Sequence, residues 1–208
     1  MSKKITAIIL ALAALLSLAA CGSSTAPEQS AALAQENAAQ EMRIVTDTWG
    51  RKVEIPYTVE SIICLGSGAP RMAAYLDVVD MMVGVEDHDK EAYNILRDYN
   101  PVYRDEIKEL PAVGSGGGSG ANNGYAEEII TVAPDVILAG FSAEAADELY
   151  GQTGIPVVCV RYLSRNFVDE SFYDAMRVFA EAVGAQERCE AVLSFIDECK
   201  QDLNDRTK

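Results

Sequence analysis

The amino-acid sequence predicts an α/β fold. We expect one Rossmann-like lobe, with a mainly parallel sheet of four to five strands flanked by helices, followed by a long helix. Two observations support this: short, continuously apolar runs recur along the chain, and helix-like segments separate them. Strands that are apolar on both faces are typical of a parallel sheet covered by helices on both sides. The runs are "SIICLG" (61–66), "MMVGV" (81–85), "DVILAG" (135–140) and "IPVVCVRY" (155–162).

The first twenty residues have the features of an export signal. Lys3 and Lys4 precede an apolar run from Ile5 to Leu18, which is too short to span a membrane comfortably. The run ends in "LAAC", which resembles the bacterial lipobox, whose cysteine becomes the lipidated N-terminus. We therefore predict a signal peptide at 1–20 and lipidation of Cys21; the alternative is an ordinary signal peptide that happens to contain a cysteine.

Residues 21–41 are rich in Ala, Ser, Gln and Glu and have no cluster of aromatic or β-branched side chains. Such a segment cannot bury enough apolar surface to fold alone. It is interpreted as a flexible tether between the lipidated cysteine and the folded part.

The elements after the tether follow from local patterns. "RIVTDTWGRKVEIP" (43–56) predicts a β-hairpin that turns near Trp49 and Gly50. The segment after the first apolar run should form a helix that opens at Pro70. "DKEAYNILRDYN" (89–100) also predicts a helix, which we expect Pro101 to stop.

The second half continues the alternation. A short strand-like piece, 110–114, precedes a glycine-rich loop, and "YAEEIITVA" (125–133) predicts the next helix. A further helix should begin at Ser142, whose side chain suits an N-cap. The stretch from 169 to the end is helical in pattern, with a break near Gly184. We predict an α/β ligand-binding lobe at 42–168 and a long connecting helix at 169–208.

Charge limits the kinds of partner. The formal net charge is −15, and removing residues 1–20, which hold two lysines and no acids, gives −17. Nucleic acid binding requires clustered Lys and Arg, so this class is excluded. An anionic ligand would need local arginines or a field shaped by a cleft.

The remaining cysteines are predicted to be unpaired. Cys64 and Cys159 lie in apolar strand-like runs, where cysteine often serves as a small buried hydrophobe. Cys189 and Cys199 are ten residues apart on one predicted helix, about 15 Å along its axis, which exceeds the reach of a disulfide. No spacing indicates zinc.

The glycine-rich stretch "VGSGGGSGANNGYAEE" (113–128) raises the possibility of a phosphate-binding loop. It contains no Gly-x-x-x-x-Gly-Lys, and its dinucleotide-like match has no long strand before it. Glu127 and Glu128 already complement the helix dipole, and Asn122 or Asn123 can cap the helix. The stretch is interpreted as a loop at the rim of a binding cleft.

Motifs for catalysis are missing. The sequence has no Gly-x-Ser-x-Gly, no His-Glu-x-x-His and no second histidine to complete a relay with His88. "EDHD" (86–89) is interpreted as a solvated acidic loop, with a metal ion at His88 as the lesser alternative. We predict neither an enzyme nor a cofactor.

Candidate binding residues follow from the strand order, because ligands of open α/β sheets sit beyond the carboxyl ends of the strands. Arg71 could bind a ligand carboxylate in bidentate fashion, or be a surface arginine. Arg161 and Tyr162 could hold a flat or anionic ligand, or pack against the long helix. Three weaker candidates lie on the same loops: Ser67, Tyr125 and Phe141.

Several segments in order resemble a known family. "RIVTDTWGRKVEIP", "VESIICLG", "DMMVGVEDH", "EEIITVAPDVILAG" and "TGIPVVCVRY", followed by "FAEAVGAQERCEAVLSFIDEC", are similar to the N-terminal half of substrate-binding lipoproteins of ABC importers. The closest group is the helical-backbone class (class III) that serves ferric siderophores, haem and cobalamin. The resemblance covers residues 42–203.

The resemblance implies two α/β lobes joined by a long helix, with the ligand between the lobes. This chain would then hold the first lobe and the helix but lack the second lobe. The implied protein is lipid-anchored on the extracytoplasmic face, captures a ferric siderophore and delivers it to the permease. Haem, cobalamin or a metal oxyanion are alternative cargoes. An exported α/β nucleotide-binding enzyme and a surface interaction module without a ligand are alternatives of another class.

Overall fold

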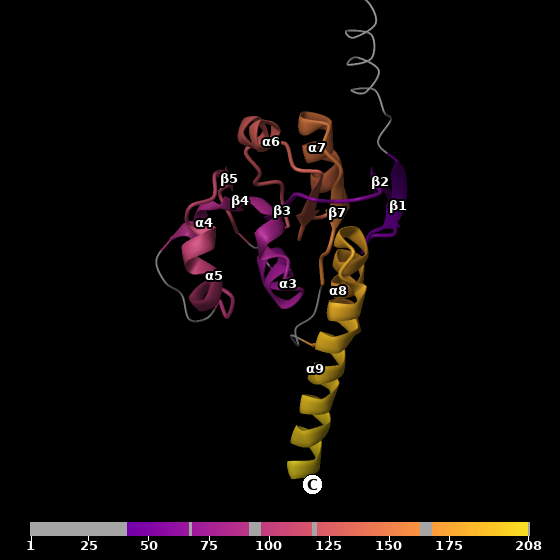
Figure 1. Cartoon of the computed structure of the whole chain (residues 1–208). Coiled ribbons are helices and arrows are strands. Elements are labelled where there is room, and N and C mark those ends of the chain that lie inside the picture. Colours follow the sequence, from indigo (N-terminus) through magenta and orange to yellow (C-terminus); the bar gives the residue numbers. More distant parts are fainter. Residues whose placement is uncertain (1–40, 67, 92–96, 118–119, 163–167, 208) are drawn as a thin grey trace, which may run out of the picture. The chain divides into compact units, whose positions relative to one another are not determined.

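The computed structural model of the chain describes residues 41–66, 68–91, 97–117, 120–162 and 168–207 (Figure 1). The predicted signal peptide, Cys21 and the tether up to residue 40 lie outside the described residues. All described residues belong to one compact unit, Glu41–Lys208.

The predicted hairpin is confirmed. β1 (Met42–Thr46) pairs antiparallel with β2 (Lys52–Pro56), with Val45 opposite Val53. The turn is closed by the carboxylate of Asp47, whose Oδ1 accepts hydrogen bonds from the backbone N–H groups of Trp49 (3.0 Å) and Arg51 (2.9 Å). Its Oδ2 accepts from the Arg51 guanidinium at 2.9 Å and from the N–H of Cys159 at 3.3 Å. One buried carboxylate thus ties the hairpin to the end of the main sheet.

The mainly parallel sheet of four to five strands that the sequence predicts is confirmed: the main sheet has five parallel strands, in the order β5-β4-β3-β6-β7. Strand β3 lies in the middle and is fully buried, which matches its unbroken apolar sequence. A 3₁₀ turn, η1 (Val79–Met81), leads into β4. The strands are β3 (Ile62–Leu65), β4 (Met82–Glu86), β5 (Ala112–Gly114), β6 (Val136–Ala139) and β7 (Val157–Cys159).

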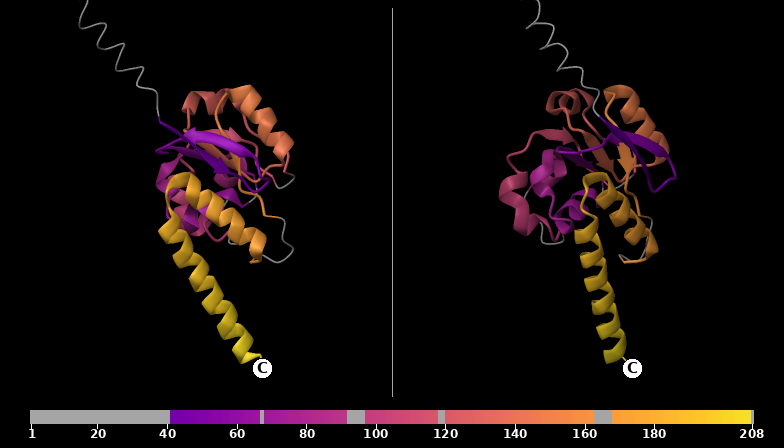
Figure 2. Two further views of the ribbon diagram at one scale, coloured as in Figure 1. Left: turned by 90° about the vertical axis from the view of Figure 1, so that its right-hand side faces the viewer. Right: turned by 45° about the vertical axis from the view of Figure 1, so that its right-hand side comes forward.

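Helices cover both faces of this sheet, so the sheet divides the core in two (Figure 2). The helices α3 (Ala69–Tyr75), α5 (Asn100–Ile107) and α8 (Glu170–Val183) contribute to the core on one face. The opposite face is covered by α6 (Ala126–Val132) and α7 (Ala143–Thr153). Burial on both faces explains why the strands carry no polar alternation.

Helix ends follow the expected chemistry in part. The Ser142 side chain caps α7 by accepting from the N–H of Ala145 at 3.2 Å, as predicted. The predicted helix at 89–100 is wrong for the described residues, since neither Glu91 nor 97–99 is helical; residues 92–96 lie outside the described residues. A short helix, α4 (Asp87–Lys90), comes first, and Pro101 lies in the first turn of α5 instead of stopping a helix. Proline fits the first turn because its missing N–H would have no partner there.

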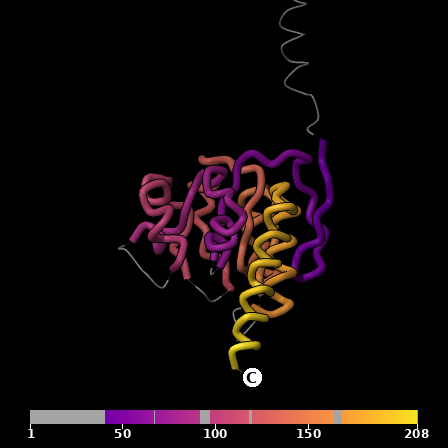
Figure 3. The backbone as a smooth tube through the Cα atoms, turned by 60° about the horizontal axis from the view of Figure 1, so that its bottom comes forward, coloured from indigo at the N-terminus to yellow at the C-terminus, as the bar shows by residue number. Residues whose placement is uncertain are grey.

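The C-terminal stretch consists of two helices. The side chain of Asp169 caps α8, and Gly184 ends it in a left-handed conformation (φ 79°), at the predicted break. The next helix is α9 (Gln186–Arg206). The hairpin lies alongside α8 (Figure 3), where Nη2 of Arg43 donates to the carbonyls of Glu181 (2.9 Å) and Ala182 (2.8 Å). A cation at the carbonyl end of a helix also complements the helix dipole.

Cys64, Cys159 and Cys189 are buried, Cys199 is exposed, and all four are free thiols. Burial raises the pKa of the Cys159 thiol to about 12, as expected for an unreactive core residue. Within the described part of the chain, no helix combines the length and the apolar character needed to cross a membrane.

Replacing Asp47 by alanine should destabilise the protein by about 3–5 kcal/mol, because the change removes the buried partner of a partly buried guanidinium and leaves three N–H groups without this acceptor. Asp147→Ala is the matched control, since this exposed carboxylate binds the same arginine at 2.8 Å but remains in water. We expect it to change the free energy of unfolding by less than about 1 kcal/mol. Urea unfolding measures both; equal effects would contradict the role given to Asp47.

Candidate functional site

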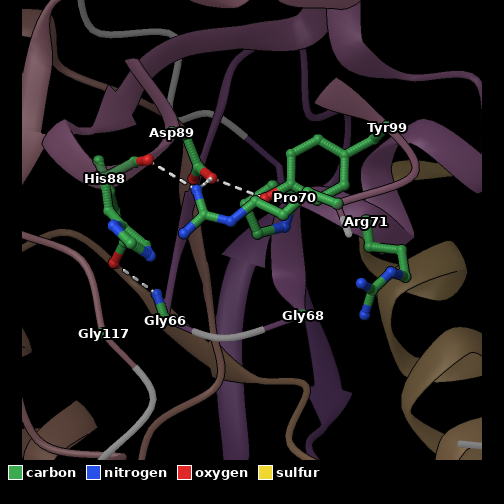
Figure 4. Close-up of a pocket in the computed structure, with 10 residues that line it drawn as sticks. Gly66, Gly68, Pro70, Arg71, His88, Asp89, Tyr99 and Gly117 are labelled. Carbon is green, nitrogen blue, oxygen red and sulfur yellow. Dashed lines mark hydrogen bonds and ion pairs between the residues drawn. The ribbon is translucent and has the colours of Figure 1, made fainter. Parts of the chain in front are cut away.

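A polar recess lies at the carboxyl end of the sheet, where β3, β4 and β5 end (Figure 4). Its volume is about 140 Å³. In Figure 4, His88 and Arg71 lie on opposite sides of the recess, with Gly66 and Gly68 between them. The lining residues are Gly66, Gly68, Pro70, Arg71, Glu86, His88, Asp89, Arg97, Tyr99 and Gly117.

The side chain of Phe141 determines where the recess opens. From β3 the chain first adds β4 and β5 on one side of the sheet and then β6 and β7 on the other. At such a reversal of strand order a crevice is expected between the two loops concerned, here those after β3 and β6. Phe141 follows β6 and is only 1% exposed. A Cβ on Gly66 would lie 3.3 Å from its ring. The crevice is therefore filled, and the opening lies one strand away, between β3 and β4.

Glu86, the last residue of β4, connects two loops beneath the recess. Its side chain is buried (3% exposed), and Oε1 accepts hydrogen bonds from the N–H of Gly66 (2.6 Å) and from Nδ2 of Asn123 (2.9 Å). Burial raises the pKa of Glu86, while these two bonds act in the opposite direction. Glu86 thereby holds the β3 loop to the glycine-rich loop.

Asp89 is the second buried acid, at 4% exposure. Its Oδ1 accepts from Nη1 of Arg97 (2.7 Å) and from the hydroxyl of Tyr99 (2.6 Å). The same Nη1 donates to the carbonyl of His88 at 2.6 Å. Burial raises the pKa of Asp89, and the bond from Tyr99 opposes this rise. This network fixes α4 against the start of α5.

The prediction of a solvated acidic loop at 86–89 is wrong for Glu86 and Asp89, because the ends of β4 and α4 turn them inward. His88 is half-exposed, and its Nδ1 lies 3.3 Å from the Glu91 carboxylate. In the described ranges, no three His, Cys, Asp or Glu side chains are arranged to hold a metal ion.

Arg71 lines the recess, yet its Nε donates to Oδ1 of Asp98 at 2.8 Å. The hydroxyl of Tyr75 donates to the other oxygen of Asp98. Burial alone would raise the pKa of Asp98, but the bonds from Tyr75 and Arg71 hold it below its usual value. Arg71 is thus fixed in orientation by an ion pair, and its contact with a ligand stays a prediction.

Arg161 lies elsewhere. Its guanidinium is 5.9 Å from the ring centre of Trp49. It lines a second depression of about 400 Å³ between the hairpin and α8, here called the hairpin groove. The structure therefore separates Arg161 from Arg71. The groove is formed by Asp47, Thr48, Trp49, Arg161, Ser171, Asp174, Arg177, Val178 and Glu181.

Tyr162 packs between the β3 loop and α8. Its ring meets that of Phe172 edge to face, with the centres 5.3 Å apart. A Cβ on Gly68 would lie 2.8 Å from its hydroxyl, so glycine is required there. Tyr162 therefore packs against α8, which agrees with the alternative role predicted for it, packing against the C-terminal helical segment. Ser67, the remaining candidate of this loop, lies outside the described residues.

The glycine-rich loop forms its own hydrogen bonds. The N–H of Ser115 donates to the carbonyl of Asn123 at 3.0 Å, and the N–H of Gly124 to the Asn122 side chain at 3.1 Å. Neither asparagine caps α6, contrary to expectation; Tyr125 holds the N-cap position without a side-chain bond. Its hydroxyl donates to Asp87 at 2.8 Å. The loop is thus fixed to the ends of β4 and β5.

Arg97 and Tyr99 are not among the residues predicted from the sequence to line the site, and Asn123 is predicted only as a helix cap. Arg97 and Tyr99 fall in the segment predicted as one helix stopped by Pro101, so their approach to Asp89 could not be expected. Glu86 directly follows the apolar run 81–85 and is the last residue of β4, but its burial arises from the loops that pack over the strand end.

Comparisons with known proteins identify the kind of protein. A family model described as periplasmic binding protein matches residues 62–208. A search of the curated proteins finds no match.

Solved structures share the fold at low sequence identity. A periplasmic solute binding protein from Veillonella parvula matches with a TM-score of 0.62 and 18% identity, over 79% of this chain and 48% of that chain. The molybdate periplasmic binding protein MolA from Haemophilus influenzae, bound to molybdate, matches with 0.62 and 20% identity over 79% and 53%. SirA from Staphylococcus aureus, complexed with staphyloferrin B, matches with 0.53 and 22% identity over 75% and 47%. The chain spans about half the length of these structures.

Replacing Glu86 by glutamine should stabilise the protein at neutral pH. The pKa of Glu86 is raised above its ordinary value of 4.5, so the folded state holds this proton more tightly than the unfolded chain. Its contribution is complete below the ordinary pKa and is lost as the pH rises through the raised value. Glutamine avoids this loss, and its amide oxygen can accept both bonds. We expect a higher melting temperature for Glu86→Gln at pH 7, with the two proteins converging as the pH falls toward 4.5.

Glu86→Ala provides the contrast, because it leaves the Gly66 N–H and the Asn123 amide without an acceptor, at about 1–3 kcal/mol for each buried donor. Thermal unfolding followed by circular dichroism measures all three proteins. A Glu86→Gln protein that melts below the unmodified one at pH 7 would show that the charge itself is needed for folding.

Proposed function

Because the chain belongs to the periplasmic binding protein family, we propose that it is an extracytoplasmic substrate-binding protein of an ABC importer and captures an iron chelate for delivery to the permease. The observation that carries the proposal is the recess at the carboxyl ends of β3, β4 and β5. Ligands of open α/β sheets bind at this edge.

The size of the recess limits what it can hold. Sites that enclose a whole small ligand have volumes of roughly 300–1,000 Å³. At about 140 Å³ the recess admits one polar group of a larger molecule. A chelate with projecting polar groups fits this arrangement, with the rest of the ligand against the surrounding loops.

The chemistry of the lining favours an iron chelate over the other cargoes. A bare oxyanion would face the buried carboxylates of Glu86 and Asp89, which repel it strongly in a site of low dielectric. Haem prefers a broad apolar surface, whereas this recess is lined by charged side chains and glycines. Of a cobalamin, the recess would hold only a single polar substituent.

The glycine-rich loop supports binding rather than nucleotide chemistry. A phosphate cradle needs free backbone N–H groups and a positive surrounding. Here the N–H groups of Gly66, Ser115 and Gly124 already have acceptors, and Glu86 lies beneath them. We therefore propose a binding protein and not an enzyme.

We also propose that a signal peptide at 1–20 exports the protein and that lipidated Cys21 anchors it to the membrane through the tether. The support is the sequence alone: the "LAAC" run and the polar segment after it. In this proposal residues 42–168 bind the ligand, and α8 and α9 form the connecting segment.

Binding of a ferric chelate should raise the melting temperature of the protein and change the fluorescence of Trp49, its single tryptophan. We would titrate a panel of ferric hydroxamate and catecholate siderophores, haem, cyanocobalamin and sodium molybdate. We expect at least one ferric chelate to bind. A shift with haem, cobalamin or molybdate instead would replace the cargo, and a shift with ATP or NAD alone would support an enzyme.

Two arginine variants locate the site. Arg71→Ala should weaken chelate binding by about tenfold or more, since a charged hydrogen bond contributes about 1.5–3 kcal/mol. Arg177→Ala is the matched control, because it removes an arginine from the hairpin groove and not from the recess. Loss of binding in Arg177→Ala, or in Arg161→Ala, with Arg71→Ala unaffected would place the ligand in the groove.

A further inference from the structure

One oxygen of Glu86 is left without a partner in the recess. The two hydrogen bonds that Glu86 accepts both reach Oε1, and among the described residues Oε2 has no hydrogen bond or ion pair. The side chain is nevertheless 3% exposed and lines the recess. The oxygen is not enclosed: among the described residues, the fully buried side-chain polar atom without a partner is Oδ1 of Asn123. Oε2 therefore opens onto the recess, where a hydrogen-bond donor of a ligand can reach it.

The nearby cations are engaged elsewhere. Nη1 of Arg97 is shared between Asp89 (2.7 Å) and the carbonyl of His88 (2.6 Å). Nε of Arg71 faces Asp98 at 2.8 Å. The other acid in the recess, Asp89, has the same charge as Glu86, and burial raises the pKa of both groups. Asp89 already has its cation, whereas in the described part of the chain no cation is bonded to Glu86, so an added positive charge beside Oε2 of Glu86 would be favourable.

Glycines leave the approach to this oxygen open. Oε2 lies 3.4 Å from the position that a Cβ on Gly116 would take, and a Cβ on Gly117 would meet nothing within 4 Å. Gly66, Gly68 and Gly117 line the recess in Figure 4. The His88 side chain borders the same approach, with its Cβ closer than Oε2 to the position that a Cβ on Gly116 would take, so a compact group would reach the carboxylate between His88 and the glycine backbone.

We infer that the recess selects ligands that carry a protonated amine, and that Oε2 of Glu86 accepts a hydrogen bond from this ammonium group. The inference rests on the proposed function of the recess as the ligand site. An ammonium group suits the small volume and supplies the missing charge. A neutral hydroxyl could also donate, but only an ammonium group brings an opposite charge to the carboxylate and adds a Coulomb attraction to the hydrogen bond.

Ferrioxamine B and its N-acetyl derivative test this directly. Both are linear ferric hydroxamates, and they differ only in a terminal ammonium that acetylation converts to a neutral amide. We expect the unmodified protein to bind ferrioxamine B about tenfold more tightly, as measured by calorimetric titration. In Glu86→Gln the preference should fall below about twofold, because the side-chain oxygen that would accept the bond becomes an N–H donor.

Glu109→Gln is the matched control. This exposed residue changes the net charge by the same amount, so it accounts for the general attraction of a chain of charge −15 for cations. The control should keep the full preference. Equal affinity for both chelates in the unmodified protein, or an equal loss of preference in both variants, would overturn the inference and leave the proposed function standing.

A second measurement does not depend on the chelate. Methylammonium chloride, compared with sodium chloride at equal concentration, should shift the backbone amide resonance of Gly66 in the unmodified protein but not in Glu86→Gln. No difference between the salts would overturn the inference. A methylammonium shift without binding of any chelate would support the chemistry of the recess and reject the iron-chelate function.

Discussion

The site depends on the position of β3, which is fully buried and paired in parallel with β4 on one side and β6 on the other. Because all five strands run in one direction, their carboxyl ends meet at one edge, and the loops that follow them must share the same small region. The chain leaves β3 through Gly66, whose left-handed conformation (φ 73°) turns it sharply. The ring of Phe141 then packs against Gly66 and closes the crevice on the β6 side. What stays open is the recess between β3 and β4, so one strand arrangement explains both its place and its limited size.

Two buried carboxylates hold the loops around this recess. Glu86 connects the N–H of Gly66 to the side chain of Asn123, and Asp89 connects Arg97 to Tyr99. Taking a charge out of water is unfavourable unless hydrogen bonds or an opposite charge replace the lost hydration. Asp89 has its guanidinium, whereas Glu86 has hydrogen bonds to one oxygen only. Residues that stabilise a fold less than a neutral substitute would often serve the function of the protein.

Most of the fold could be predicted from the sequence, since the signals involved are local and strong. The hairpin, the continuously apolar strands, the cap at Ser142 and the break at Gly184 each depend on a few adjacent residues. The error at Pro101 arose because proline suits the first turn of a helix as well as the position after one, and sequence alone does not distinguish the two. At 86–89 four polar residues indicated a solvated loop. Whether an acid there faces water depends on what the neighbouring strands and helix place over it.

The sequence by itself determined the class of fold and the order of the elements along the chain, because apolar periodicity and turn residues act over short distances. It also placed Arg71 and His88 shortly after two of the apolar strands. Only the tertiary structure decided which of these side chains meet. It separated Arg161 from Arg71, buried Glu86 and Asp89, filled the crevice with Phe141, and brought Asn123 to a residue 37 positions away. Such contacts arise when distant segments pack together, and the burial that shifts a pKa or leaves an oxygen unpaired exists only after that packing.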